Sequence, residues 1–266
     1  MVGAVSVVLH EMDARGVATV TLNRPEIHNA YNGALIDALA AALAELARAP
    51  ALCAVVLRAN GKHFSAGADL NWLRQAADFT PAQNLDFSVR TVEAVHALMA
   101  FPVPTLAVVQ GACYGGGVGL VAACDVAVCA EDAAFALTEV RVGVNPAPIV
   151  RQAIAAAGVR HARRYLLTGE RFDAAEARRI GLVHETAPRE ALDGAVAKIV
   201  DALLMGGPQA LRETKTLVLA LSGALGDAHE RATLAAQAAH RRASPEAREG
   251  LTAFLEKRRP AWAPAP

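Results

Sequence analysis

The chain has 266 residues, of which 54% are hydrophobic, and its 26 basic residues are balanced by 26 acidic ones. This length and apolar content suffice for a sizeable buried core in one α/β unit with an appendage. The zero net charge excludes a general electrostatic attraction to nucleic acid or to an anionic membrane, so neither is expected as a partner.

The first half of the chain is predicted to alternate strands and helices. Two segments rich in β-branched residues flank a hairpin turn at residues 13–16, and Asn32 is expected to cap a helix that begins at Gly33. Strands are predicted at residues 5–9, 17–22, 53–57, 105–109, 125–130 and 134–137, a second helix at about 82–100, and loops at 60–69 and 110–117.

After about Pro148 the strand patterns almost vanish and helical patterns follow one another. The expected helices cover residues 159–167, 174–180, 189–204, 208–221, 228–241 and 245–257. The sequence therefore predicts an α/β core over residues 1–200 and a helical region over residues 201–266.

The start of the chain and its longest apolar stretch indicate where the protein is located. No basic segment followed by an apolar run opens the chain, and the longest apolar stretch, residues 105–128, is interrupted by Gln110, glycines and Asp125, so we expect a cytoplasmic protein. The four cysteines form no Cys-x-x-Cys pair and are interpreted as small buried hydrophobes, with a catalytic thiol as the alternative. The histidines lack metal-ligand spacing, so no metal is expected, and the Arg241–Arg242 pair is interpreted as a solvated helix face or a subunit contact.

Two glycine-containing loops come directly after apolar strands, at residues 63–69 and 115–117. Small residues let a backbone approach a ligand closely, and two such loops can aim two N–H groups at one oxygen. That arrangement suits a thioester carbonyl that becomes an enolate. Taken alone, however, glycine loops after strands are more often simple turns.

Two other interpretations of these loops are weaker. Gly117, Gly119 and Ala122 fit a dinucleotide-binding pattern, but the preceding strand ends near Val109, too far from Gly117 for a strand-to-helix turn. Ser65 lacks the preceding glycine of a nucleophile elbow, so its hydroxyl is expected to bond the backbone.

Ordered motifs along almost the whole chain resemble the crotonase superfamily of enoyl-CoA hydratases and isomerases. They are Val-Thr-Leu-Asn-Arg-Pro at residues 20–25, Phe-Ser-Ala-Gly-Ala-Asp-Leu at 64–70, three glycines at 115–117, Cys-Asp at 124–125, Arg-Arg-Ile-Gly-Leu-Val at 178–183 and a closing helix at 249–258. The resemblance implies an α/β fold, a spiral of ββα units followed by a C-terminal helical trimerisation region, and a homotrimer or hexamer.

The resemblance also implies the site. The backbone N–H groups of Ala66 and Gly116 would bind the thioester oxygen, and Phe254 and Lys257, from a neighbouring subunit, would meet the adenine or 3′-phosphate. The rest of coenzyme A would lie along Glu26, Ile27, His28, Ala66, Gly67, Ala68, Asp69 and Leu70. Coenzyme A is part of the substrate, so no separate cofactor is expected.

The chain departs from the family at the catalytic carboxylates. The family's first glutamate usually lies three residues after the middle glycine of the second loop, where this chain has Gly119, whereas the second matches Glu139. Glu139 is therefore the expected acid and base. We favour a hydratase acting on a branched or glutaconyl-type enoyl-CoA, as in leucine degradation. A Δ3-Δ2-enoyl-CoA isomerase with one carboxylate, or a catalytically silent CoA-binding member, remain the alternatives.

Overall fold

The structure, a computed structural model, describes residues 6–76 and 78–264. Its main sheet has the strand order β1-β2-β3-β4-β6-β9. β1 pairs antiparallel with β2, and the other neighbours pair parallel. The strands are β1 (Val8–Met12), β2 (Val17–Leu22), β3 (Ala54–Ala59), β4 (Thr105–Val109), β6 (Val126–Ala130) and β9 (Glu185–Ala187).

A second sheet contains β5 (Ala112–Tyr114), β7 (Ala134–Ala136) and β8 (Arg171–Asp173). β4 and β6 lie in the main sheet, and the strands that follow them, β5 and β7, lie in the second. Each of these pairs then leads into a helix, α4 (Gly116–Ala123) and α5 (Val150–Thr168) respectively. The chain therefore repeats a strand–strand–helix unit, as the family resemblance implies.

The main sheet is covered on both faces, which explains why its strands are so apolar. On one face, Val20 and Leu57 pack in the large core with Leu39 of α1 (Gly33–Leu46). On the other, Val56 and Val108 pack with α7 (Leu192–Leu204). Asn32 accepts a hydrogen bond from the Leu35 amide at 3.0 Å, so the predicted helix cap is confirmed.

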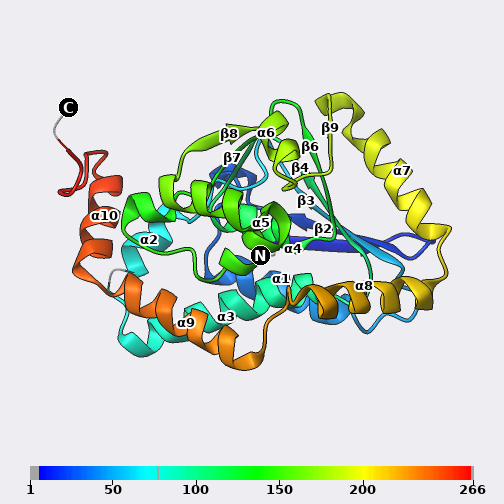
Figure 1. The fold of residues 1–266 in the computed structure, drawn as a ribbon, viewed down its shortest axis with the longest axis horizontal. Coiled ribbons are helices and arrows are strands. Elements are labelled where there is room, and N and C mark those ends of the chain that lie inside the picture. Colours follow the sequence, from blue (N-terminus) through cyan, green and yellow to red (C-terminus); the bar gives the residue numbers. More distant parts are fainter. Residues whose placement is uncertain (1–5, 77, 265–266) are drawn as a thin grey trace, which may run out of the picture.

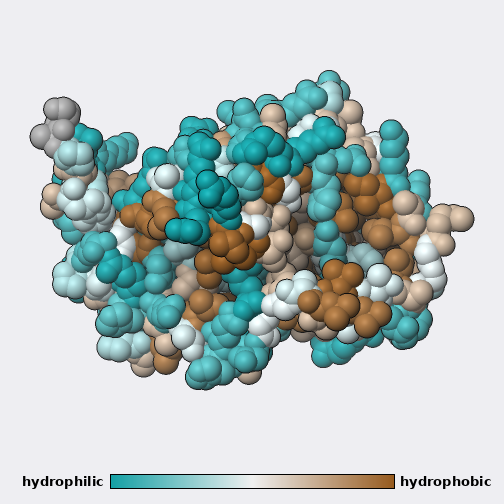
Figure 2. All heavy atoms as spheres, in the orientation of Figure 1, coloured by the Kyte–Doolittle hydropathy of each residue, from teal (hydrophilic) through white to brown (hydrophobic). Residues whose placement is uncertain are grey.

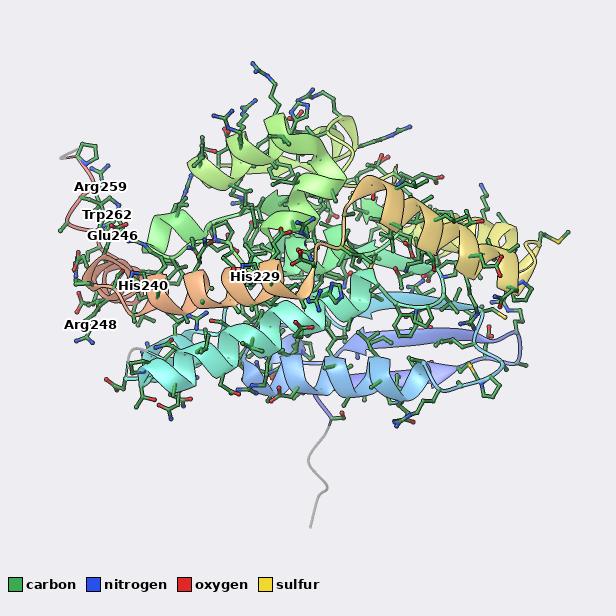
Figure 3. All side chains as sticks on the ribbon, turned by 60° about the horizontal axis from the view of Figure 1, so that its bottom comes forward. His229, His240, Glu246, Arg248, Arg259 and Trp262 are labelled. Carbon is green, nitrogen blue, oxygen red and sulfur yellow. The ribbon has the colours of Figure 1, made fainter. Side chains whose placement is uncertain are left out.

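The C-terminal helices fold back onto the core of the same chain. They are α8 (Pro208–Ser222), α9 (Ala228–Arg242) and α10 (Pro245–Leu255). In Figure 1, α9 runs alongside α3 (Pro81–Met99), and Figure 3 shows the same pairing from below, with His229 and His240 along α9. α10 packs against α2 (Leu70–Ala76) and the short 3₁₀ helix η2 (Glu139–Val142). None of the described helices combines the length and apolar composition that a membrane crossing requires.

Several predicted elements differ from the structure. The loop predicted at residues 110–117 contains strand β5. The first strand lies at Val8–Met12 rather than at residues 5–9, of which residue 5 is outside the described part. After Pro148 the described strands are β8 and β9, three residues each and too short for a clear sequence pattern, in line with the prediction that strands almost vanish there. α2 was not predicted, and residues 116–123 were assigned to a loop and a buried run because three of them are glycine, yet they form α4, a mostly buried helix.

Candidate active site

A cavity of about 620 Å³ opens where the second glycine loop, η2 and helices α3, α9 and α10 meet. Both glycine loops line it, through residues 66–68 and 115–117, and Glu139 lines it from η2. Most of its other walls are apolar, including Leu35, Val95 and Leu120. The structure therefore brings together the three features that the sequence marks as candidates for chemistry.

The first loop is held by buried polar contacts. Arg24 donates to the Asp69 carboxylate at 2.8 Å, and Asp69 also accepts from the backbone amide of Asn71 at 2.9 Å. Burial raises the pKa of Asp69, but these hydrogen bonds outweigh it and leave the pKa below its usual value. The amide of the buried Asn29 donates to the carbonyls of Asn60 and His63. Asp69 is therefore a structural group that fixes the loop.

The backbone amides of this loop are not equivalent. The Ala66 N–H donates to the His28 carbonyl at 2.9 Å, so the predicted donor is already occupied within the chain. The backbone N–H of Tyr31 donates to the Gly67 carbonyl, and the backbone carbonyl of Tyr31 accepts from the Asp69 amide. Because neighbouring amides of an extended segment point to opposite sides, this pairing turns the N–H of Ala68 away from Tyr31. Within residues 6–76 and 78–264, the Ala68 N–H has no partner, and Ala68 lines the cavity. In the first loop, therefore, the amide left free among the described residues is that of Ala68, two residues after the predicted Ala66.

The second loop presents an amide at a helix end. Gly115 has φ 52° and ψ −124°, a conformation that glycine adopts at little cost, and its N–H bonds the Ala136 carbonyl at 2.8 Å. α4 then begins at Gly116, whose N–H lacks a partner in the described chain, as expected at a helix start. A Cβ on Gly115 would stand 3.9 Å from the Cα of Gly67, so the two loops nearly touch.

Glu139 faces these loops from η2. Its Oε1 atom would lie 3.1 Å from a Cβ on Gly115, so glycine makes room for the carboxylate. Its Oε2 atom is buried and has no hydrogen-bond partner among the described residues. Burial raises the pKa of Glu139 to about 7. A carboxyl with this pKa exchanges protons readily near neutral pH.

Two further residues shape the surroundings of Glu139. The Asn145 Oδ1 atom is buried, lines the same cavity, and finds no partner in the part of the chain that is described. Ile149 fills the space beside Gly119, because its Cγ2 atom would lie 2.2 Å from a Cβ there. Asn145 thus offers a free acceptor, whereas position 119 has no room for a carboxylate.

Tyr31 and Arg242 line the cavity as well. The Tyr31 ring lies against Gly116, and burial together with the nearby Glu139 raises the pKa of its hydroxyl to about 12. Arg242 reaches the cavity from α9 with its guanidinium over the rings of Trp72 and Phe87. The prediction that Arg241–Arg242 form a solvated face is therefore wrong for Arg242, because aromatic side chains cover it.

Other sequence expectations can be placed directly. Ser65 Oγ donates to the Asn29 carbonyl at 3.0 Å and accepts from the Gly67 amide, which confirms that its hydroxyl bonds the backbone. The His63 Nδ1 atom accepts from the Ala112 amide at 2.9 Å. Cys113 is buried and free, and burial raises the pKa of its thiol, which opposes a thiolate nucleophile.

Only some of the residues expected to hold coenzyme A line the cavity. Glu26 and Ile27 lie in a 3₁₀ turn, η1 (Pro25–Ile27), and His28 follows it, next to the first loop but outside the cavity lining. Leu70 is the first residue of α2. Phe254 is half exposed and lines the cavity of its own chain, whereas Lys257 follows α10 in a left-handed conformation. A contribution from a neighbouring subunit stays a prediction.

Sequence reasoning missed Asn145 and Arg242 as residues of the cavity, and it placed Ala68 along coenzyme A without singling out its amide. The backbone pairing of Tyr31 with Ala68 distinguishes the Ala68 amide from the other amides of the loop, and no local sequence pattern predicts that pairing. Arg242 had a signal, because it stands four residues after Ala238 and three after Ala239, on the buried face of α9.

Comparisons with known proteins agree on one family. Residues 13–264 match the family model described as enoyl-CoA hydratase/isomerase. A putative enoyl-CoA hydratase of Thermus thermophilus is 39% identical over 92% of this chain and 96% of its own. A trans-2-decenoyl-[acyl-carrier-protein] isomerase of Streptococcus mutans is 30% identical over 95% and 96%. The crystal structure of an enoyl-CoA hydratase from Mycobacterium avium has a TM-score of 0.85 and 37% identity, and the match covers 98% of this chain and 100% of that one.

Proposed function

The chain belongs to the enoyl-CoA hydratase/isomerase family, and from this membership we propose that it is a hydratase that adds water across the 2,3 double bond of an enoyl-CoA, of branched or glutaconyl type. Membership also confirms the predicted fold class, an α/β crotonase fold with C-terminal helices. The proposal rests on one observation above all. The Glu139 carboxylate oxygen without a hydrogen-bond partner shares a cavity with two backbone amides, those of Ala68 and Gly116, that also lack one among the described residues.

In the proposed reaction, the amides of Ala68 and Gly116 donate to the thioester oxygen. Glu139 takes a proton from water while the hydroxide oxygen bonds to C3, and the electron pair of the double bond moves onto the thioester as an enolate. Glu139 then returns the proton to C2, so one water is added and the carboxylate is regenerated. Gly116 is the first residue of α4, so the partial positive charge of the helix end favours the enolate oxygen.

A hydratase with one glutamate needs a second group to hold the water. Asn145 supplies one in this proposal, because its Oδ1 and the Glu139 Oε2 are both buried, unpartnered among the described residues and in one cavity. A water that donates to both atoms would satisfy them and leave its own lone pair free to attack. This pair of orphaned acceptors favours hydration over isomerisation.

An isomerase is the second candidate. One carboxylate suffices to move a proton between C2 and C4, the site holds Glu139 without room for another at position 119, and the relative from Streptococcus mutans is named an isomerase.

A catalytically silent CoA-binding member is the third candidate. A buried carboxyl with its pKa near 7 opposes it, because such a group is costly unless it has a use.

We also propose that the chain assembles into a trimer or hexamer. α8 buries none of its residues fully, and it exposes Leu217, Val218 and Leu221. Figure 2 shows an apolar patch over this helix. A second copy that covers the patch would remove this apolar surface from water. Sedimentation of the purified chain tests the assembly, and a monomer would refute it.

Mass spectrometry separates the candidate functions. Enoyl-CoA esters of different length and branching, each as the 2-enoyl and 3-enoyl isomer, are incubated with the enzyme in ¹⁸O-water. Hydration adds one labelled water to the 2-enoyl esters, whereas isomerisation interconverts the two esters without a mass change. Labelled 3-hydroxyacyl product supports the hydratase, isomer exchange without label supports the isomerase, and no change with any ester supports the silent member.

A further inference from the structure

Arg242 extends from α9 into the cavity that also contains Glu139. Its guanidinium carbon lies 5.0 Å from the centre of the Phe87 ring and 5.7 Å from that of Trp72. These two rings are tilted by 37° with their centres 4.3 Å apart, so the cation lies over both of them. The side chain is therefore held in one place rather than free in solvent.

The hydrogen bonds of Arg242 leave most of its donors unused. Nη1 donates to Asn84 Oδ1 at 3.2 Å and to Ser88 Oγ at 3.3 Å, with a longer contact to the Asn84 carbonyl at 3.5 Å. Nε and Nη2 have no partner, and no carboxylate pairs with this guanidinium, within residues 6–76 and 78–264. Arg241, the adjacent residue, is paired with Glu246.

Arg242 is half-buried, and its Nε and Nη2 atoms are not among the buried atoms that lack a partner, so they are accessible from the cavity. Neutral acceptors and ring faces offset only part of the cost of partly removing a cation from water, so an anion would bind favourably here. The free Nε and Nη2 donors form the planar fork that matches a carboxylate. Because the fork borders the cavity, the missing anion is expected to arrive with the ligand.

Contacts along the cavity indicate which part of the ligand carries that anion. The Tyr31 ring lies against Gly116, the Trp72 ring lies 6.4 Å from the Tyr31 ring, and Arg242 lies over Trp72. Arg242 is thus separated from the Gly116 amide by two aromatic rings. The turn at residues 26–28, beside the first loop, does not line this cavity.

We infer that Arg242 binds a carboxylate at the far end of the acyl group, so that the substrate is an enoyl thioester with a second, free carboxylate. The inference rests on the proposed function, because the Gly116 amide fixes the thioester end of the acyl chain. It goes further by choosing the carboxylate-ended acyl group over a merely branched one and by assigning Arg242 as the residue that binds the carboxylate.

Binding tests this without turnover. Saturated thioesters of coenzyme A are titrated in matched pairs, succinyl with butyryl, glutaryl with valeryl, and adipoyl with hexanoyl, by calorimetry. For at least one length, the carboxylate-ended ester should bind the wild type about ten- to a hundredfold more tightly, the worth of a charge-assisted pair. Methyl-ended esters that bind equally or better at every length would overturn the inference, whether or not any variant folds.

Variants then assign the preference to Arg242. Arg242→Met should abolish it while binding of methyl-ended esters changes little, and Arg242→Lys should restore part of it. The matched control is Arg248→Met, since Arg248 is exposed and lies at the outer edge of α10 in Figure 3. Equal weakening of both esters by Arg242→Met would mean that Arg242 only anchors α9 to α3, and the inference would be wrong.

Thioesters of pantetheine, which lack all phosphates, exclude the other source of an anion. The carboxylate preference and its loss in Arg242→Met should persist with them. If Arg242→Met weakens both coenzyme A esters but neither pantetheine thioester, the anion is a phosphate of the coenzyme. Hydration of methyl-ended 2-enoyl esters reports the proposed function separately: water addition without a carboxylate preference would refute the subsite alone.

Discussion

Ile149 occupies the space that a side chain on residue 119 would need, because its Cγ2 atom lies 2.2 Å from the position of a Cβ on Gly119. Position 119, which matches the family's first glutamate, thus carries glycine, and packing of Ile149 leaves no room for a longer side chain there. The site therefore depends on Glu139 and on its neutral neighbours.

Gly119→Glu should consequently damage the fold before it adds a carboxylate. Forcing extra atoms into a packed site typically costs about 1–3 kcal/mol, so the melting temperature should fall and hydration of crotonyl-CoA should not rise. The double variant Gly119→Glu, Ile149→Gly removes the obstacle, and we expect it to recover stability and to gain crotonyl-CoA hydration. A single variant as stable as the wild type would show that Ile149 moves aside easily.

Glu139→Gln should remove proton transfer and keep the shape of the site. We expect kcat to fall by about 10²–10⁴-fold, with little change in the affinity for a saturated acyl-CoA. In the wild type, kcat/KM should decline as the pH falls below about 7, because protonated Glu139 cannot accept a proton from water. A wild-type profile flat from pH 5 to 8, or a variant of normal activity, would remove Glu139 from the mechanism.

The same substitution makes a prediction about stability with a defined sign. The pKa of Glu139 is about 7 in the fold and near its usual value of 4.5 when unfolded, so between these values the folded state binds more protons. The free energy of unfolding of the wild type therefore falls as the pH rises through this window, by up to about 3 kcal/mol. Glu139→Gln lacks this dependence. The unfolding free energy of the variant minus that of the wild type, measured by chemical denaturation, should therefore be larger at pH 8 than at pH 4.5. A stability difference that does not vary with pH would show that Glu139 is not desolvated.

Asn145→Ala tests how the water is held. Loss of one acceptor should lower kcat for hydration about tenfold and leave KM nearly unchanged. Exchange of a C2 proton of a saturated acyl-CoA with deuterated solvent needs Glu139 and the enolate but no water at C3, so it should continue at the wild-type rate. If both rates fall together, Asn145 only supports the loop that bears it.

Much of this site follows from sequence, and the exceptions have physical causes. Gly115–Gly117 and Glu139 stand out because few other residue types fit there, as the close approach of the carboxylate to Gly115 illustrates. Ala68 could not be distinguished from Ala66, since the difference lies in which amide bonds His28 and which faces away from Tyr31. α4 was hidden because glycine is a poor helix former, and its helix is maintained by burial in the core. Asn145 and Ile149 acquire their roles only through tertiary contacts.

The central claim is that the backbone amides of Ala68 and Gly116 stabilise the enolate. The most direct test replaces one amide by an ester through semisynthesis, at residue 68 and, as the matched control, at residue 66. The ester at 68 should lower kcat about a hundred- to a thousandfold, the usual cost of losing one preorganised donor, while affinity for a saturated acyl-CoA changes little. The ester at 66 breaks the hydrogen bond to the His28 carbonyl, so it should lower the melting temperature and leave kcat within a few-fold. The opposite pattern, with kcat lost at 66 and retained at 68, would contradict the account.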